Sequence, residues 1–259
     1  LRARRGGGGG LMRVAVDARQ AYRADRRGIG RTLVNLLRAL APLRPDWHFE
    51  LFHEAPAADD PFAGLPNISR RQVSIPASYR FDLWERARLP LAAWASRADV
   101  LFCPANTGPG FSSVPLLLMV HDMIPVDDAP GDPATRDWLR RVGRAARIAR
   151  RVYTPSEYSR GRIIEHLKLP PERVVAVPSA AEPAVAAGGE PADADRARAK
   201  YGLAPGRPFA FGFAAADPRK NTRRVVEAWA KLPEAVRARF DLLMVGAQEP
   251  ALSEFRQLA

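Results

Sequence analysis

Residues 115–120 read PLLLMV and are followed directly by His121 and Asp122. A short apolar run without alternation is typical of a parallel strand that is buried on both faces of its sheet. Open parallel sheets bind ligands beyond the carboxyl ends of their strands. The pattern therefore predicts that His121 and Asp122 lie at a binding edge as candidate catalytic residues, and an imidazole there can hydrogen-bond a hydroxyl or a phosphate.

Strand and helix patterns alternate on both sides of this run. We expect further strands at 12–17, 48–52, 72–76, 99–103, 151–154 and 173–177, and helices at 28–43, 80–97, 133–150 and 156–169. Ser156 is the expected N-cap of the last of these helices. Repeated βα units indicate an α/β fold with a Rossmann-like, doubly wound parallel sheet. We therefore assign residues 12–178 to one N-terminal domain.

The composition changes at both ends of this region. Residues 1–11 form a Gly/Arg-rich leader that we expect to be disordered, and residues 179–194 form an Ala/Pro/Gly-rich linker. The βα pattern restarts at 195–259, with strands expected at 208–214 and 241–245 and helices at 195–201, 221–231 and 252–259. Because an open sheet usually needs more strands, we expect 195–259 to be only the start of a second, truncated domain.

The bulk composition excludes several classes of protein. No run of 18 apolar residues is present, so we expect no transmembrane helix. The single cysteine, Cys103, cannot form an internal disulfide and is expected to be a packed core thiol, as in a protein of a reducing compartment. The net charge of +12 favours anionic ligands, but aromatic residues do not interleave with the basic clusters, so nucleic acid is not expected as a partner.

Two glycines open the first long helix. Gly28 and Gly30 allow close approach of a ligand to the backbone, and the helix N-terminus offers free N–H groups to a phosphate. A dinucleotide fingerprint is excluded because Leu33 occupies the third glycine position. The alternative is that the glycines only mark the start of the helix.

A second anion site is indicated by residues 217–221, DPRKN, which follow an expected strand and open a helix. Arg219 can grip two phosphate oxygens, and Lys220 adds a mobile charge. Its alternative is a solvated helix start. Asp193 and Asp195 have D-x-D spacing but lie in the linker, so we assign them to helix capping and expect no metal and no cofactor.

Helix 136–151 carries a row of arginines, namely Arg140, Arg144, Arg147 and Arg151. This row predicts peripheral contact with an anionic membrane. The alternative is a solvated helix face in an arginine-rich protein.

Five stretches together resemble the retaining GT-B glycosyltransferases of family 4, the "glycosyltransferase group 1" enzymes. They are MRVAVDAR with GIGRTLVNLL, VHDMIP, YTPSEYSRGRI, DPRKN with its flanks, and LLMVG, in the family's order. The resemblance implies two Rossmann-like domains that face across a cleft. It also implies that Gly28, Gly30, Arg219 and Lys220 bind the donor diphosphate and that His121 contacts the transferred sugar.

The resemblance implies a metal-independent, retaining transfer of a hexose-type sugar from a GDP- or UDP-sugar to a glycan or lipid-linked acceptor. Cell-envelope polysaccharide or glycolipid synthesis in the cytoplasm, at the inner face of the plasma membrane, is the expected setting. The family's E-x(7)-E element of the second domain is not found within 195–259, and Ser179-Ala180-Ala181 replaces the usual Asn-Gly turn. Two alternatives remain. One is that this chain is inactive and only binds a ligand, and the other is an inverting enzyme in which Asp17 or Asp122 acts as the base. An epimerase is disfavoured because Y-x-x-x-K is absent.

Overall fold

The computed structural model describes residues 11–26, 28–54, 59–73, 83–180 and 191–258. The chain divides into two compact units, Leu1–Ala180 (unit 1) and Ala181–Ala259 (unit 2). The leader predicted at 1–11 lies outside the described residues except for Leu11, and so does most of the linker predicted at 179–194.

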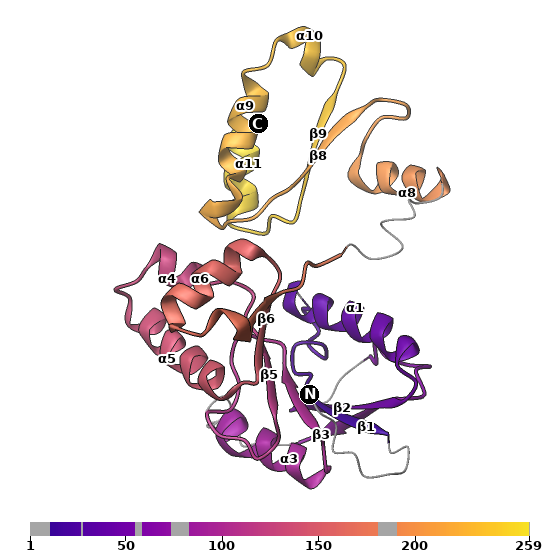
Figure 1. The fold of residues 1–259 in the computed structure, drawn as a ribbon. Helices are drawn as coiled ribbons and strands as arrows, with labels where there is room; N and C mark the ends of the chain where they lie inside the picture. Colours follow the sequence, from indigo (N-terminus) through magenta and orange to yellow (C-terminus); the bar gives the residue numbers. More distant parts are fainter. Residues whose placement is uncertain (1–10, 27, 55–58, 74–82, 181–190, 259) are drawn as a thin grey trace. The chain divides into compact units, whose positions relative to one another are not determined.

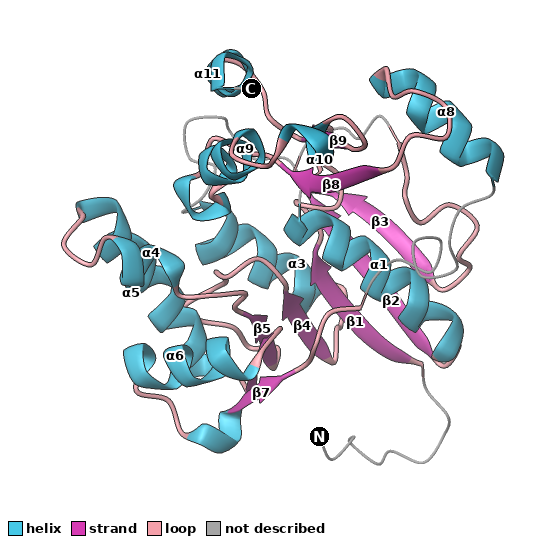
Figure 2. Cartoon of the chain, turned by 90° about the horizontal axis from the view of Figure 1, so that it is seen from above, coloured by secondary structure: helices cyan, strands magenta, loops and turns pink. Residues whose placement is uncertain are grey.

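Unit 1 is built on a parallel sheet with the strand order β3-β2-β1-β4-β5-β6-β7 (Figures 1 and 2). Its strands are β1 (Met12–Asp17), β2 (Trp47–His53), β3 (Ile68–Gln72), β4 (Val100–Cys103), β5 (Leu116–Met119), β6 (Arg151–Thr154) and β7 (Val174–Ala176). The described helices are α1 (Gly28–Leu43), η2 (Trp84–Arg88), α3 (Leu89–Ala95), α4 (Ile124–Asp128), α5 (Pro133–Ile148), α6 (Glu157–Leu167) and η3 (Pro171–Arg173). This is the doubly wound α/β fold that the sequence predicts.

Side-chain alternation in β1 shows how the sheet is covered. Val14 and Val16 pack into one apolar cluster with Leu33 and Leu37 of α1. Ala15, between them, belongs to the opposite cluster, which contains residues of α3, α5 and α6. Figure 1 shows α1 on one side of the strands and α4, α5 and α6 on the other. The sheet is therefore buried on both faces, as continuous apolar strands require.

The strand order places a switch point between β1 and β4. From β1 the chain proceeds to β2 and β3 at one edge, then crosses back to β4 on the other side of β1. The carboxyl ends of β1 and β4 thus lie where connections diverge to opposite faces, the usual ligand-binding position in an open α/β sheet.

Several boundaries differ from the sequence prediction. The strand expected at 72–76 is found at Ile68–Gln72, where Phe49 of β2 pairs with Ile68. The single helix expected at 80–97 is a π-helical turn, η2, followed by α3, and residues 80–82 lie outside the described part. The short helix α4 was not predicted. Ser156 is the N-cap of α6, as predicted, because its side chain accepts a hydrogen bond from the Ser159 amide.

Unit 2 contains two parallel strands, β8 (Phe209–Phe213) and β9 (Asp241–Val245). The helical turn η4 (Pro218–Lys220), α9 (Thr222–Ala230) and α10 (Glu234–Arg237) connect them, and α11 (Ala251–Leu258) follows β9. The helix α8 (Pro191–Tyr201) begins inside the segment predicted as a linker, with Pro191 in the first-turn position that proline favours. No described helix is long and apolar enough to cross a membrane.

Candidate functional site

The position of His121 follows from the end of β5. Its amide donates a 2.7 Å hydrogen bond to Oδ1 of Asn106, and its Nε2 atom lies 2.8 Å from the carbonyl oxygen of Pro104. A carbonyl oxygen can only accept, so Nε2 must carry a proton in this arrangement. Among the described residues none hydrogen-bonds Nδ1, which is therefore left to a ligand. The imidazole is half-buried, and with Nε2 as the donor its Nδ1 atom can accept a hydrogen bond from a hydroxyl.

Asp122 has a local role beside its neighbour. Its Oδ1 accepts a 3.1 Å hydrogen bond from the amide of Ile124, the first residue of α4. Free amides at a helix start are commonly satisfied by such a side chain. The sequence singled out Asp122 as catalytic, and the structure gives it a role in starting α4.

The two predicted glycines differ in their surroundings. A Cβ atom built on Gly30 would lie 2.2 Å from the carbonyl oxygen of Gln20, whereas one built on Gly28 would meet nothing within 4 Å. Close packing against residue 20 thus explains Gly30. Gly28 is exposed at the start of α1, so packing does not explain its lack of a side chain.

A buried ion cluster lies at the carboxyl end of β1. Asp17 accepts hydrogen bonds from Nε and Nη2 of Arg19 at 3.0 and 2.8 Å, and Nη2 also lies 3.4 Å from Oε1 of Glu85. The same Oε1 accepts a 2.5 Å hydrogen bond from the Thr107 hydroxyl in the loop after β4. Asp17 and Glu85 are 2% and 5% exposed, so solvent hardly screens these contacts.

The charges of this cluster depend on one another. Burial raises the pKa of Glu85 above its ordinary value. The hydrogen bond from Thr107 and the charge of Arg19 lower this pKa, but the effect of burial is larger. Burial alone would lower the pKa of Arg19, but Asp17 and Glu85 raise it above its ordinary value and keep the guanidinium charged. Sequence reasoning missed Arg19 and Glu85 as a pair because 66 residues separate them. The sequence hinted at this cluster only through Asp17 and Arg19, which belong to the MRVAVDAR stretch that carries part of the family resemblance. Nothing in the sequence pattern pointed to Glu85.

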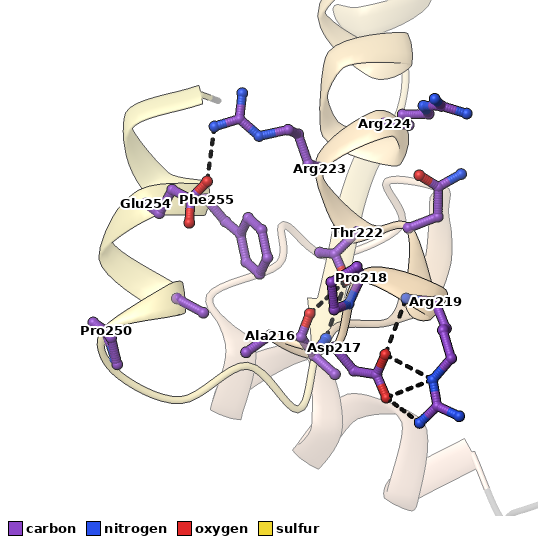
Figure 3. A pocket seen from close by; sticks show the side chains of 13 residues that line it. Ala216, Asp217, Pro218, Arg219, Thr222, Arg223, Arg224, Pro250, Glu254 and Phe255 are labelled. Carbon is purple, nitrogen blue, oxygen red and sulfur yellow. Dashed lines mark hydrogen bonds and ion pairs between the residues drawn. The ribbon is translucent and has the colours of Figure 1, made fainter. Parts of the chain in front are cut away.

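The cationic turn of unit 2 lines an open pocket of about 900 Å³ at the carboxyl ends of β8 and β9 (Figure 3). Arg219 forks onto Asp217, with Nε 3.0 Å from Oδ1 and Nη2 2.5 Å from Oδ2. The Arg219 side chain and amide lower the pKa of Asp217 to about 2. Asp217 thus orients Arg219 and offsets part of its charge.

Lys220 is the other predicted cation of this turn. It is exposed, and within the described part of the chain no hydrogen bond or ion pair joins its side chain to another residue. The hydroxyl of Thr222 accepts from the Ala215 amide and donates to the Ala215 carbonyl, both at 3.1 Å, which fixes the turn to the start of α9. The turn is therefore braced while Lys220 remains available to an anion.

The opposite wall of the pocket was not predicted as part of a site. Glu254 of α11 accepts a 2.8 Å hydrogen bond from Nη2 of Arg223, and Phe255 points toward the pocket beside it (Figure 3). The sequence signal for a helix at 252–259 was present, but nothing in its pattern placed it beside α9.

The remaining predicted features lie apart from these groups. In the described residues no group of three or more His, Cys, Asp or Glu side chains could hold a metal, and Asp193 pairs with Arg196. Cys103 is fully buried, as predicted, and burial raises the pKa of its thiol. Arg140, Arg144 and Arg147 are exposed on α5, while Val142 and Ala145 on its apolar side pack into the core and cannot enter a membrane.

A family model described as Glycosyltransferase Family 4 matches residues 26–185. No curated protein sequence matches the chain.

Solved structures share the fold. HepE from Anabaena, in complex with UDP-glucose, is 16% identical, with a TM-score of 0.66 over 95% of this chain and 65% of that one. A glycosyltransferase from Rickettsia africae is 14% identical, with a TM-score of 0.62 over 95% of this chain and 64% of that one. An E. coli protein bound with UDP-2-fluoroglucose is 13% identical, with a TM-score of 0.58 over 95% of this chain and 68% of that one. The chain thus spans about two thirds of their lengths and has the fold of GT-B Rossmann-like glycosyltransferases.

Proposed function

The chain belongs to glycosyltransferase family 4, and we propose that it transfers a hexose-type sugar from a nucleotide-diphosphate donor to a glycan or lipid-linked acceptor. The donor is a UDP- or GDP-sugar, and the reaction proceeds with retention and without a metal ion or other cofactor. The observation that carries the proposal is the braced cationic turn of unit 2, in which Arg219 lines a pocket and the next residue, Lys220, is exposed but is not one of the residues that line it.

The chemistry of the turn suits a diphosphate. Transfer builds negative charge on the departing diphosphate, and fixed cations stabilise that charge in the transition state. Lys220 supplies an exposed ammonium group, and Arg219, which Asp217 holds in place, adds a second positive charge. UDP-glucose and UDP-2-fluoroglucose are present in two proteins of similar fold, which supports a UDP-sugar over a GDP-sugar.

Binding of UDP to the purified chain, measured by calorimetry, tests the turn. We expect Lys220→Ala to weaken binding roughly tenfold, since a hydrogen bond to a charged group is lost. Lys231→Ala is the matched control, because Lys231 is also exposed but lies at the other end of α9. Equal affinities of the two variants would exclude Lys220 from the donor site.

His121 and the glycines are the proposed contributions of unit 1. The Nδ1 atom of His121 can hydrogen-bond a hydroxyl of the transferred sugar, because Nε2 is engaged by Pro104. Gly28 can present the N-terminus of α1 to the diphosphate. His121→Ala is expected to lower kcat for transfer from UDP-glucose while leaving UDP binding within about twofold of the original.

Retention is supported over inversion by the surroundings of the candidate bases. Asp17 is 2% exposed and engaged by Arg19, and Asp122 supports the start of α4. Neither arrangement favours a general base in contact with an acceptor hydroxyl. The anomeric configuration of the first-formed product, read by proton NMR, tests this: a β-linked product from an α-linked donor contradicts retention. Undiminished transfer in EDTA is expected.

The second candidate function is that of a binding half without transferase activity. It requires only the cationic turn of unit 2, which Asp217 and Thr222 hold in place. It predicts UDP binding that depends on Lys220 and no turnover with any donor or acceptor.

The proposed setting is cell-envelope polysaccharide or glycolipid synthesis in the cytoplasm. The exposed row of Arg140, Arg144 and Arg147 on α5 supports contact with an anionic inner membrane face. Vesicles containing phosphatidylglycerol are expected to bind the chain, and Arg140→Glu with Arg144→Glu to abolish binding. Equal binding to neutral vesicles would contradict an electrostatic contact.

A further inference from the structure

The loop after β4 holds His121 at two points. The carbonyl oxygen of Pro104 accepts from the imidazole, and the side chain of Asn106 accepts from the His121 amide. Asn106 has a φ of +66°, a left-handed backbone conformation that a non-glycine residue adopts at a cost. The orientation of the imidazole therefore depends on a loop whose conformation needs support from its surroundings.

Part of that support comes from the buried ion cluster. Thr107 follows Asn106 directly, and its hydroxyl donates a 2.5 Å hydrogen bond to Glu85. Glu85 is held in turn by Arg19, which is fixed by Asp17 at the end of β1. Because Glu85 is only 5% exposed, water is a poor replacement for the Thr107 hydroxyl at this carboxylate.

We propose that Glu85 and Thr107 are positioning residues that fix the 104–107 loop and, through it, the orientation and tautomer of the His121 imidazole. The consequence for transfer rests on the proposed role of His121. Neither residue needs to touch the sugar. They keep the proton on Nε2 of His121, where it is donated to the carbonyl oxygen of Pro104. The Nδ1 atom of the same ring is then directed toward the ligand.

The loop has other restraints, and these define the test. The Asn106 amide donates to Met119 of β5 at 2.9 Å, so the loop stays attached to the sheet when Thr107 changes. Thr107→Val removes the hydroxyl at nearly constant shape, and Thr107→Ser restores it. Thr154→Val is the matched control, because Thr154 is fully buried and its hydroxyl has no hydrogen-bond partner among the described residues.

The measurement is the nitrogen-15 NMR spectrum of the imidazoles, in which four histidines are assigned by substitution. We expect Thr107→Val to shift the Nε2 and Nδ1 signals of His121 away from the pattern of the Nε2-protonated form. Thr107→Ser and Thr154→Val should leave them in place. An unchanged His121 spectrum in folded Thr107→Val overturns the proposal. If that variant does not fold, Glu85→Leu takes its place with the same expectation and the same overturning result.

Kinetics separates this inference from the proposed function. With UDP-glucose we expect Thr107→Val to lower kcat roughly tenfold, with the donor KM within about twofold, because misplacement of a contact group acts on the transition state. A shifted His121 spectrum with unchanged kcat supports the positioning role and contradicts a catalytic contact by His121. An unchanged spectrum contradicts positioning whether or not transfer occurs.

Discussion

The Nε atom of Arg219 lies 3.0 Å from Oδ1 of Asp217, two residues earlier in the chain. The same carboxylate accepts from the Arg219 amide, also at 3.0 Å. One short turn thus contains a cation, its counter-ion and a second cation, Lys220, which also lowers the pKa of Asp217 but forms no direct ion pair with a described side chain. This arrangement gives the two predicted phosphate ligands different properties.

The Asp217 pKa is the first prediction. A carbon-13 NMR titration should give a midpoint of about 2 for this carboxyl, and Arg219→Gln should return it toward the ordinary value of 3.8. Because the folded-state pKa is depressed, the pair's stabilisation is present above the unfolded pKa and is lost as the pH falls through the folded value. UDP binding should therefore not titrate through Asp217 between pH 5 and 8. A midpoint that Arg219→Gln leaves unchanged would contradict the pairing.

The two glycines of α1 give the second prediction. Gly30→Ala is expected to destabilise unit 1 by about 1–3 kcal/mol, because its Cβ would overlap the Gln20 carbonyl. Gly28→Ala should leave the urea midpoint unchanged or slightly raised, since its Cβ meets open space and alanine favours helix. If Gly28 faces the diphosphate, the same variant weakens UDP binding without loss of stability. Equal urea midpoints for the two variants would contradict the close approach at residue 30.

The difference between these glycines shows how far a sequence pattern reaches. Helical periodicity predicts one apolar face of α1 with Ile29, Leu33, Leu36, Leu37 and Leu40. Leu33 and Leu37 do lie in the core, whereas Leu36 is 39% exposed. The apolar run at 115–120 likewise identified β5. The same pattern could not separate Gly28 from Gly30. That distinction depends on the path of the 18–26 segment over the helix, which is a tertiary property.

The site residues also divide into those that local pattern predicts and those that depend on tertiary contacts. His121 was predicted because it directly follows the strand now called β5, and Arg219 and Lys220 were predicted because they follow β8. Glu85 was not predicted as a site residue. Its partners are Arg19, just after β1, and Thr107, in the loop after β4, and both are distant from it in the sequence. Its stretch, read from the sequence as a regular helix, forms a π-helical turn. Long-range pairs of buried charges leave no periodic trace in the chain.

The third prediction concerns Arg19. Arg19→Met should destabilise unit 1 by about 3–5 kcal/mol, because Asp17 and Glu85 would remain buried without their cation. Arg23→Met is the control, since its pair with Asp25 is exposed and should change stability by less than about 1 kcal/mol. Urea denaturation followed by circular dichroism measures both. A loss at Arg19 no greater than that at Arg23 would show that the buried cluster does not depend on its arginine.

The fourth prediction concerns Thr222, whose hydroxyl both accepts from and donates to the backbone of Ala215. Thr222 is 3% exposed, so Thr222→Val keeps the shape but leaves the Ala215 amide without this partner, at a cost of about 1–3 kcal/mol. Hydrogen exchange at the Ala215 amide should accelerate in Thr222→Val and remain slow in Thr222→Ser.

The turn that Thr222 braces also carries Lys220, so loss of the brace should reach the ligand. UDP affinity is expected to fall several-fold in Thr222→Val, by less than in Lys220→Ala, because the ammonium group is retained but is no longer held in one place. Thr222→Ser should bind UDP like the original chain. Accelerated exchange at Ala215 with unchanged UDP affinity would mean that the anion site does not require a fixed turn, and that charge at Lys220 is sufficient.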